Sequence, residues 1–400
     1  MNYKVILESS IMQKGKPATA GSKMLESFIS PIDATVMTRL EDADVSIIGR
    51  AEMDEFGASG LFATVSLNDK SQMANDKTQM TKDKSCDIGK TGDSSLSCSN
   101  AELLTEAVND VAGDKADIAL CNDYTGAVSH AAATRGVCYI HPTYGTVSRY
   151  GLIPVAPSID QIGVVCRTPA DGFNALRLIA GYDSKDGAMF SDEARTAGAS
   201  SMREKPPQLR ISYVKPKYSE IYTQLMQILC CAELSNNISR YDGVKFGYRT
   251  KDYSSLRELY TKSRTEAFSA DVKLAAIIGA MVLSQENYTR YYEKAMQLRR
   301  LIRDSLEFDK YDLICETNSE TGETEQDSRD ETGHGYLSHS DTRASNISSC
   351  VLLSRLCGLP SVVTPDCIYV ANVGCENILE EMCKGISCDE QGLVSGGKAL

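Results

Sequence analysis

The pattern of apolar and polar residues predicts helices and strands that alternate along much of the chain. Residues 33–50 read DATVMTRLEDADVSIIGR, which indicates an amphipathic helix capped by Asp33 and then a short strand at Val45–Ile48. The stretch LLTEAVNDVAGDKADIAL predicts a helix that ends near Gly113 and a strand at 117–120. Strands that alternate with helices are typical of a sheet covered by helices.

Further elements follow the same rule. The stretch PADGFNALRLIAG, at 169–181, places Phe173, Leu176 and Ile179 on one face of a helix and a glycine at its end. Residues 254–310 are rich in good helix formers. Apolar strands are predicted near 361–363 and at 368–373, with a closing helix over ENILEEMCKG. We expect Val45–Ile48 and Val362–Val363 to be interior strands of the sheet.

Two segments lack such patterns. From Asn68 the chain repeats NDKSQMA, NDKTQMT and KDKSCDI, with one methionine per seven residues. A coiled coil needs two apolar positions per heptad, so we expect 68–100 to be a polar, mobile insertion. The GKT within it lacks the preceding glycine of a phosphate loop, because Lys84 stands there. Residues 316–345 are acidic and predict a flexible loop, in which His334 and His339 are expected to be solvated rather than metal-bound.

Composition narrows the functional classes. The hydrophobic content of 42% and the charged content of 24% are ordinary for a soluble globular protein. The net charge of −12 argues against direct nucleic-acid binding and against anionic lipid, unless a local patch or another subunit holds the partner. No apolar run is long enough for a membrane span. The chain has fourteen cysteines and no signal peptide, which predicts a cytoplasmic protein with reduced, buried thiols. These include the adjacent Cys230 and Cys231, and no metal site is expected.

The stretch HPTYGTVSRYGLIPVAPSIDQIG, at 141–163, has neither the helical nor the strand period of a segment that only fills a core. It places polar and aromatic side chains among glycines, prolines and serines. We expect these side chains to form the wall of a pocket: Tyr144, Arg149, Tyr150, Ser158 and Asp160.

This stretch closely resembles the amidase signature family and, within it, the A subunits of tRNA-dependent amidotransferases. The resemblance continues in SKMLESFISPIDATVMTRLEDADVSIIGRAEMDEFG (22–57), in SNNISRYDGVKFGYR (235–249) and in LCGLPSVVTP, and leaves out 68–100 and 316–345. It implies a single domain over 1–400 with the α/β amidase signature fold, a central twisted mixed sheet covered by helices, and no cofactor. It also implies a Ser-Ser-Lys triad: one serine attacks a carboxamide, a second serine relays its proton to a lysine, and loop amides hold the oxyanion.

The positions that match the triad have lost its chemistry. The family's lysine lies in a strand that here reads VILESSI, which puts Glu8 at the lysine. The family's D-T-G-G-S-I-R corresponds to DYTGAVS, which puts Ala127 at the nucleophile and Ser129 at the arginine. The relay serine falls nominally on Leu103, without the family's glycines, and the register of 94–110 stays open. The former oxyanion loop comprises Asp123, Tyr124, Thr125 and Gly126.

Two further positions also depart from the family's pattern. The family's glutamine-holding arginine is replaced by Leu274 or Ala275, and the acid before the family's F-T-V-P-A-N segment becomes Ser348. The family's leading helices are also expected to be missing before the first strand.

The sequence therefore predicts a catalytically inactive amidase-like protein, a pseudoenzyme with a binding or vestigial role. The partners that the resemblance implies are the amidotransferase B and C subunits, or a small amide ligand. One alternative is an active amidase or glutamine amidotransferase with a rearranged site, whose nucleophile would be Ser94, Ser95, Ser129 or Cys98. A further alternative is an unrelated hydrolase that uses His130 or His141.

Overall fold

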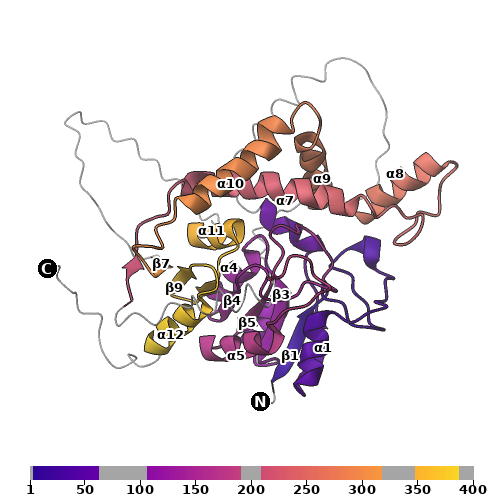
Figure 1. Cartoon of the computed structure of the whole chain (residues 1–400). Helices are drawn as coiled ribbons and strands as arrows, with labels where there is room; N and C mark the ends of the chain where they lie inside the picture. The colour runs from indigo at the N-terminus through magenta and orange to yellow at the C-terminus, as the bar shows by residue number, and fades with distance from the viewer. Residues whose placement is uncertain (1–2, 63–105, 191–208, 318–346, 387–400) are drawn as a thin grey trace, which may run out of the picture.

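A mixed sheet forms the centre of the computed structural model, which describes residues 3–62, 106–190, 209–317 and 347–386 (Figure 1). The described strands form one nine-stranded sheet in the order β2-β1-β3-β5-β4-β8-β9-β7-β6. β2, β1 and β3 run parallel, and β5 turns antiparallel to β3. The strands are β1 Lys4–Glu8, β2 Ser46–Ala51, β3 Ile118–Asn122, β4 Cys138–His141, β5 Ile162–Cys166, β6 Ile211–Ser212, β7 Leu313–Thr317, β8 Ser361–Val363 and β9 Cys367–Ala371.

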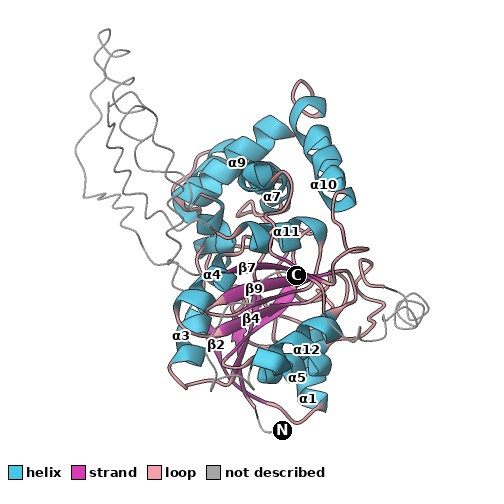
Figure 2. Ribbon diagram, turned by 90° about the vertical axis from the view of Figure 1, so that its left-hand side faces the viewer, coloured by secondary structure: helices cyan, strands magenta, loops and turns pink. Residues whose placement is uncertain are grey.

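Helices cover both faces of this sheet (Figure 2). On one face lie α1, α5 and α12, and on the other lie α3, α4, α7, α9, α10 and α11. The helices are α1 Thr35–Asp42, α3 Glu106–Ala112, α4 Ala127–Thr134, α5 Pro169–Ile179, α7 Tyr222–Ile238, α8 Leu256–Ala267, α9 Ala270–Val282, α10 Lys294–Asp304, α11 Ser349–Cys357 and α12 Glu376–Ile386. Four shorter helical segments are η1 Lys23–Leu25, η2 Glu55–Leu61, η3 Ser219–Ile221 and η4 Thr289–Glu293.

Side chains alternate between two apolar cores along the central strands, as the period of a strand requires. Val5 and Leu7 of β1 pack in the core under α1, α5 and α12, whereas Ile6 packs with Val108 of α3 on the opposite face. All five residues of β3 are buried, because both faces of the sheet are covered. The α/β fold with a mixed central sheet is thereby confirmed.

The helix predicted at 169–181 is confirmed as α5. It begins where Thr168 accepts a hydrogen bond from the backbone N of Asp171, 3.2 Å away, and Pro169 occupies its first turn. Its buried face contains Phe173, Leu176 and Ile179. The strand predicted at 117–120, the helix ending near Gly113 and the closing helix also correspond to described elements, β3, α3 and α12.

The strand expected at Val45–Ile48 is not an interior strand. β2 spans Ser46–Ala51, lies at the edge of the described sheet and leaves Ile48 47% exposed. A run of apolar residues is compatible with either position, and only the strand order distinguishes them. The prediction for Val362–Val363 is confirmed, because β8 lies between β4 and β9.

The predicted cap of α1 was also wrong. The N-cap residue is Ala34, which makes no side-chain cap, and the helix begins at Thr35. Asp33 instead accepts a hydrogen bond on Oδ1 from the backbone N of Lys14, 2.7 Å away. The aspartate therefore fixes the preceding loop rather than the helix.

The helical region 254–310 is divided into separate helices by serine caps. Ser255 and Ser269 accept hydrogen bonds from the backbone N of Glu258 and Val272, so α8 and α9 each have a new start. α9 packs so closely on α7 that a Cβ on Gly279 would lie 2.1 Å from the carbonyl oxygen of Cys231. Only glycine permits this approach.

The described cysteines are free thiols, and most are buried. Burial raises the pKa of Cys231 to about 12 and that of Cys230 well above its ordinary value. Within the described part of the chain, no helix is both long and apolar enough to cross a membrane. The predicted insertion at 68–100 and all but the first two residues of 316–345 lie outside the described residues.

Candidate functional site

The site begins at the carboxyl ends of β1 and β3, which lie side by side because these strands are parallel. Glu8 ends β1 and is buried. Its Oε2 accepts hydrogen bonds from Oγ of Ser10 at 2.5 Å and from the backbone N of Asn122 at 3.1 Å. Burial raises the pKa of Glu8 to about 7, and the nearby Asp54 and Asp123 act in the same direction. A buried carboxyl group thus stands at the position that the sequence resemblance assigns to the family's lysine.

The loop after β3 is held by Asp123. Its carboxylate accepts hydrogen bonds from the backbone N of Val128 and of Ser129, each at 3.0 Å, and from the Ser129 hydroxyl. These bonds satisfy free donors in the first turn of α4. Gly126 precedes α4 with φ +85°, and Oγ1 of Thr125 accepts from the backbone N of Ala127 at 3.3 Å. The Thr125 hydroxyl is therefore used within the loop.

A buried arginine reaches this loop from α11. Nη2 of Arg355 lies 2.8 Å from Oδ2 of Asp123, and both side chains are 0% exposed. Nε donates to the carbonyl oxygen of Asp123 at 2.7 Å, and Nη1 donates to Oγ of Ser354 at 2.7 Å. Arg355 also donates to the Ser129 hydroxyl. The sequence reasoning missed Arg355, although a single cation within the apolar run VLLSRLC signals a buried partner.

Ala127, which the sequence resemblance assigns to the nucleophile position, begins α4 and is 8% exposed. A Cβ on Gly60 would lie 3.1 Å from that of Ala127 and 2.4 Å from Oγ1 of Thr125, so η2 packs directly on this loop. The adjacent hollow has a volume of about 20 Å³, room for about one water molecule. It is lined by Gly60, Leu61, Thr125, Thr223, Met226, Gln227, Ile347 and Leu352.

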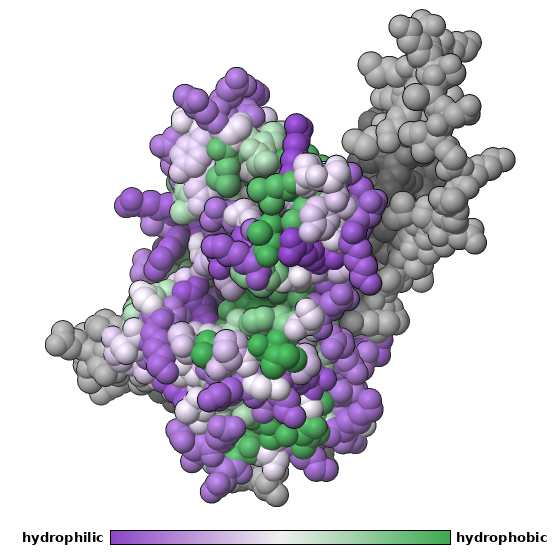
Figure 3. Space-filling view, turned by 90° about the vertical axis from the view of Figure 1, so that its right-hand side faces the viewer, coloured by the Kyte–Doolittle hydropathy of each residue, from purple (hydrophilic) through white to green (hydrophobic). Residues whose placement is uncertain are grey.

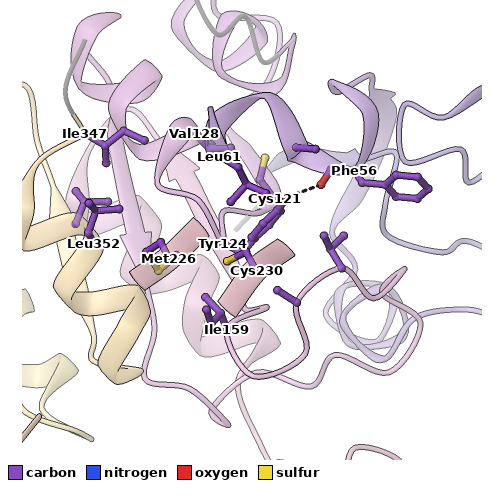
Figure 4. Packing of buried hydrophobic residues seen from close by; sticks show 14 of the residues in the cluster. Phe56, Leu61, Cys121, Tyr124, Val128, Ile159, Met226, Cys230, Ile347 and Leu352 are labelled. Carbon is purple, nitrogen blue, oxygen red and sulfur yellow. Dashed lines mark hydrogen bonds between the residues drawn. The ribbon is translucent and has the colours of Figure 1, made fainter. Parts of the chain in front are cut away.

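Apolar side chains gather around this hollow (Figure 4). Leu61 comes from η2, Met226 from α7, Leu352 from α11 and Ile347 from the residues just before α11. The hydroxyl of Tyr124 donates to the carbonyl oxygen of Phe56 at 2.9 Å, the bond drawn in Figure 4. Burial raises the pKa of Tyr124 well above its ordinary value, so its hydroxyl is a structural donor rather than an acid or base.

The predicted wall at 141–163 is internally bonded. Arg149 forms an ion pair with Asp186, 2.9 Å from Nη2 to Oδ1, rather than with Asp160. Its Nη1 donates to the Tyr144 hydroxyl at 2.8 Å, and that hydroxyl donates to the carbonyl oxygen of Pro157 at 2.7 Å. The ammonium group of Lys185 lies over the ring of Tyr150. In the described part of the chain, these wall side chains are therefore engaged in contacts with neighbouring protein groups.

Ser158 and Asp160 are likewise engaged. The backbone N and the hydroxyl of Ser158 both donate to Glu233, and Arg299 donates to the Ser158 hydroxyl at 3.0 Å. Asp160 is buried and accepts from the side-chain amide of Asn122 at 3.0 Å. It therefore ties the wall to the end of β3.

Of the other predicted positions, Leu274, Ala275 and Ser348 lie in the described part of the chain. Leu274 is 43% exposed and Ala275 is buried, so the inward position is occupied by a methyl group. Ser348 caps α11 and donates to Glu316 at 2.7 Å. The positions Leu103, Ser94, Ser95, Cys98, His334 and His339 lie outside the described residues.

The alternatives use Ser129 as a nucleophile or His130 or His141 as catalytic residues, and these side chains differ in solvent access. Ser129 is 0% exposed, and its hydroxyl is enclosed between Asp123 and Arg355. Burial lowers the pKa of His130, and it lowers that of His141 well below its ordinary value. His141 is 1% exposed. No group of three or more metal-binding side chains occurs among the described residues.

The amidase family model matches residues 5–64, 110–224 and 208–372 of this chain. The chain belongs to the amidase signature family. The matched ranges include β1 with Glu8, the loop and α4 with Ala127, the wall at 141–163 and α11 with Arg355.

Curated relatives are glutamyl-tRNA(Gln) amidotransferase A subunits. The one from Lachnoclostridium phytofermentans is 34% identical over 78% of this chain, which spans 66% of that relative's length. The one from Trichodesmium erythraeum is 30% identical over 94% of this chain and 82% of its own length.

Solved structures share the fold. The A subunit from Thermotoga maritima matches with a TM-score of 0.61 at 20% identity, covering 97% of this chain and 83% of its own. The peptide amidase from Stenotrophomonas maltophilia matches with a TM-score of 0.62 at 19% identity, covering 98% and 83%.

Proposed function

We propose that this amidase-family chain is a pseudoenzyme: a non-catalytic counterpart of an amidotransferase A subunit with a binding or vestigial role. The observation that carries the proposal is Ala127, a methyl group at the position of the nucleophile, at the start of α4. A serine nucleophile needs a base to take its proton, and the position of the family's lysine is held by Glu8, a carboxyl that accepts hydrogen bonds from Ser10 and Asn122.

The surroundings support the same proposal. Thr125 and the tight approach of Gly60 alter the loop that would hold an oxyanion. Asp123, Ser129 and Arg355 are engaged with one another and are buried. We also infer that 1–400 form one domain, and that the chain acts in the cytoplasm.

The partners that fit an A-subunit-like chain are the amidotransferase B and C subunits, with a small amide as the alternative ligand. Size-exclusion chromatography of the chain with both subunits from its own organism tests the binding role. A shared peak supports the proposal. Separate elution of all three at micromolar concentration would leave a vestigial role.

An active amidase or amidotransferase with a rearranged site is the second candidate. Of its proposed nucleophiles, only Ser129 is described, and it is the residue enclosed by Asp123 and Arg355. Ammonia release from glutamine distinguishes the two candidates. A rate indistinguishable from buffer supports the pseudoenzyme, and a clear rate supports the rearranged site.

A further inference from the structure

A basic and aromatic surface lies around α8, away from Ala127 and its loop. Residues 240–260 contain five lysines and arginines against three aspartates and glutamates, although the whole chain carries a net charge of −12. We call the exposed side chains of residues 240–260 the α8 surface. Figure 3 views the molecule from the side on which α8 lies in Figure 1, and its upper half mixes hydrophobic with hydrophilic residues.

Large apolar side chains are exposed among these cations. Phe246 is 45% exposed, Tyr253 44% and Leu256 68%. Exposed lysines and arginines stand beside them at positions 245, 249, 251 and 257, and none of these four forms an ion pair with another described residue. Arginine and aromatic residues are enriched in the centre of protein–protein interfaces, whereas single exposed apolar residues are ordinary.

In the free chain, the loop that forms part of the α8 surface is already fixed against α8. Glu266 accepts hydrogen bonds from the Tyr248 hydroxyl at 2.7 Å and from the Thr250 hydroxyl at 3.0 Å. The backbone N of Thr250 donates to Oγ of Ser263 at 3.1 Å. Lys262 lies 2.9 Å from Asp252 across the same junction. A surface ordered in advance loses less conformational entropy on binding.

We propose that the α8 surface is the docking site of a protein partner whose contacting face is acidic around an apolar centre. Charge complementarity supports an acidic partner, because residues 240–260 have an excess of two positive charges in a chain of the opposite net sign. The aliphatic Val244 and Leu256 support a protein over a nucleic acid, because phosphates and base edges offer such side chains few contacts. This inference rests on the proposed binding role and assigns it a surface.

The test compares charge reversals at two places. Arg249→Glu with Arg257→Glu alters the α8 surface, and Lys294→Glu with Arg300→Glu makes the same charge change on exposed positions of α10. Affinity for the B and C subunits is measured by calorimetry at low and at high salt, after circular dichroism has shown that both variants are folded. We expect about tenfold or greater weakening for the first pair, little change for the second, and weaker binding of the natural chain at high salt.

In one contrary result, the natural chain binds and both pairs of substitutions weaken binding equally; in another, it binds and neither pair weakens binding. Either result would overturn the assignment of the surface and leave the binding role intact. No binding by the natural chain would remove both. A labelled single-stranded RNA is measured in parallel. RNA binding that depends on Arg249 and Arg257, without subunit binding, would overturn the protein partner in favour of a nucleic acid.

Discussion

Arg355 and Asp123 form an ion pair in which neither side chain reaches solvent, with Nη2 2.8 Å from Oδ2. The same guanidinium donates to the backbone carbonyl of Asp123, so it fixes both the side chain and the main chain where the loop begins. α11 and α4 are thereby joined through the loop that we propose corresponds to the family's nucleophile loop. Buried bonds fix this loop, although Ala127 carries no reactive group.

Removal of the arginine should be strongly destabilising. Arg355→Met leaves a buried carboxylate without its partner, and we expect the free energy of unfolding to fall by about 3–5 kcal/mol. Urea denaturation followed by circular dichroism measures the change. Arg167→Met is the control, because Arg167 is 37% exposed in its pairs with Asp114 and Asp117, and about 1 kcal/mol or less is expected. Equal losses for the two variants would contradict the structural role of the buried pair.

Glu8 should make stability depend on pH. Its pKa is raised from an ordinary 4.5 to about 7 in the folded chain, so folding favours the protonated form. This contribution is complete below about pH 4.5 and is lost as pH rises through about 7. Relative to Glu8→Gln, the natural chain should lose about 3 kcal/mol between about pH 5 and about pH 8. Denaturant midpoints of both proteins at the two pH values provide the measurement, and parallel changes would refute the assignment.

Gly126 should resist substitution because of both its backbone and its neighbours. Its φ is +85°, and a Cβ would lie 2.6 Å from Cγ1 of Val351 and 2.9 Å from Cγ2 of Ile347. We expect Gly126→Ala to lower the free energy of unfolding by about 2–4 kcal/mol. Gly136 also has a positive φ, but its Cβ would meet nothing within 4 Å, so Gly136→Ala isolates the backbone effect at about 1–2 kcal/mol. A larger loss at Gly136 would show that packing around Gly126 has been misjudged.

The sequence predicted those parts of the fold that depend on local pattern. α5 could be placed because Thr168, Pro169 and the spacing of Phe173, Leu176 and Ile179 act within one helix. The edge position of β2 could not be predicted, because strand order is decided by pairing between distant segments. The cap at Asp33 failed for a similar reason: the competing donor, the backbone N of Lys14, lies on another loop.

At the site, the family motifs singled out Glu8, Asp123 and Ala127, and the structure brings the first two into one region at the ends of β1 and β3. The motifs could not reveal Arg355, because its role depends on α11 reaching a loop more than two hundred residues earlier in the chain. They also could not reveal the partner of Arg149, since Asp186 lies outside the resembling stretch. Side-chain partners across the fold are set by three-dimensional packing.

The most direct test of the central claim is ammonia release from glutamine by the natural chain and by Ala127→Ser. Triad members act as a unit, so restoring one of several lost members returns almost no activity. The resemblance puts Glu8 in place of the lysine, so we expect a serine at 127 to lack its base, and an altered oxyanion loop alone costs about 10²–10³ in rate. We predict background release for both proteins. A clear rate from the natural chain, or a large gain from Ala127→Ser alone, would contradict the account.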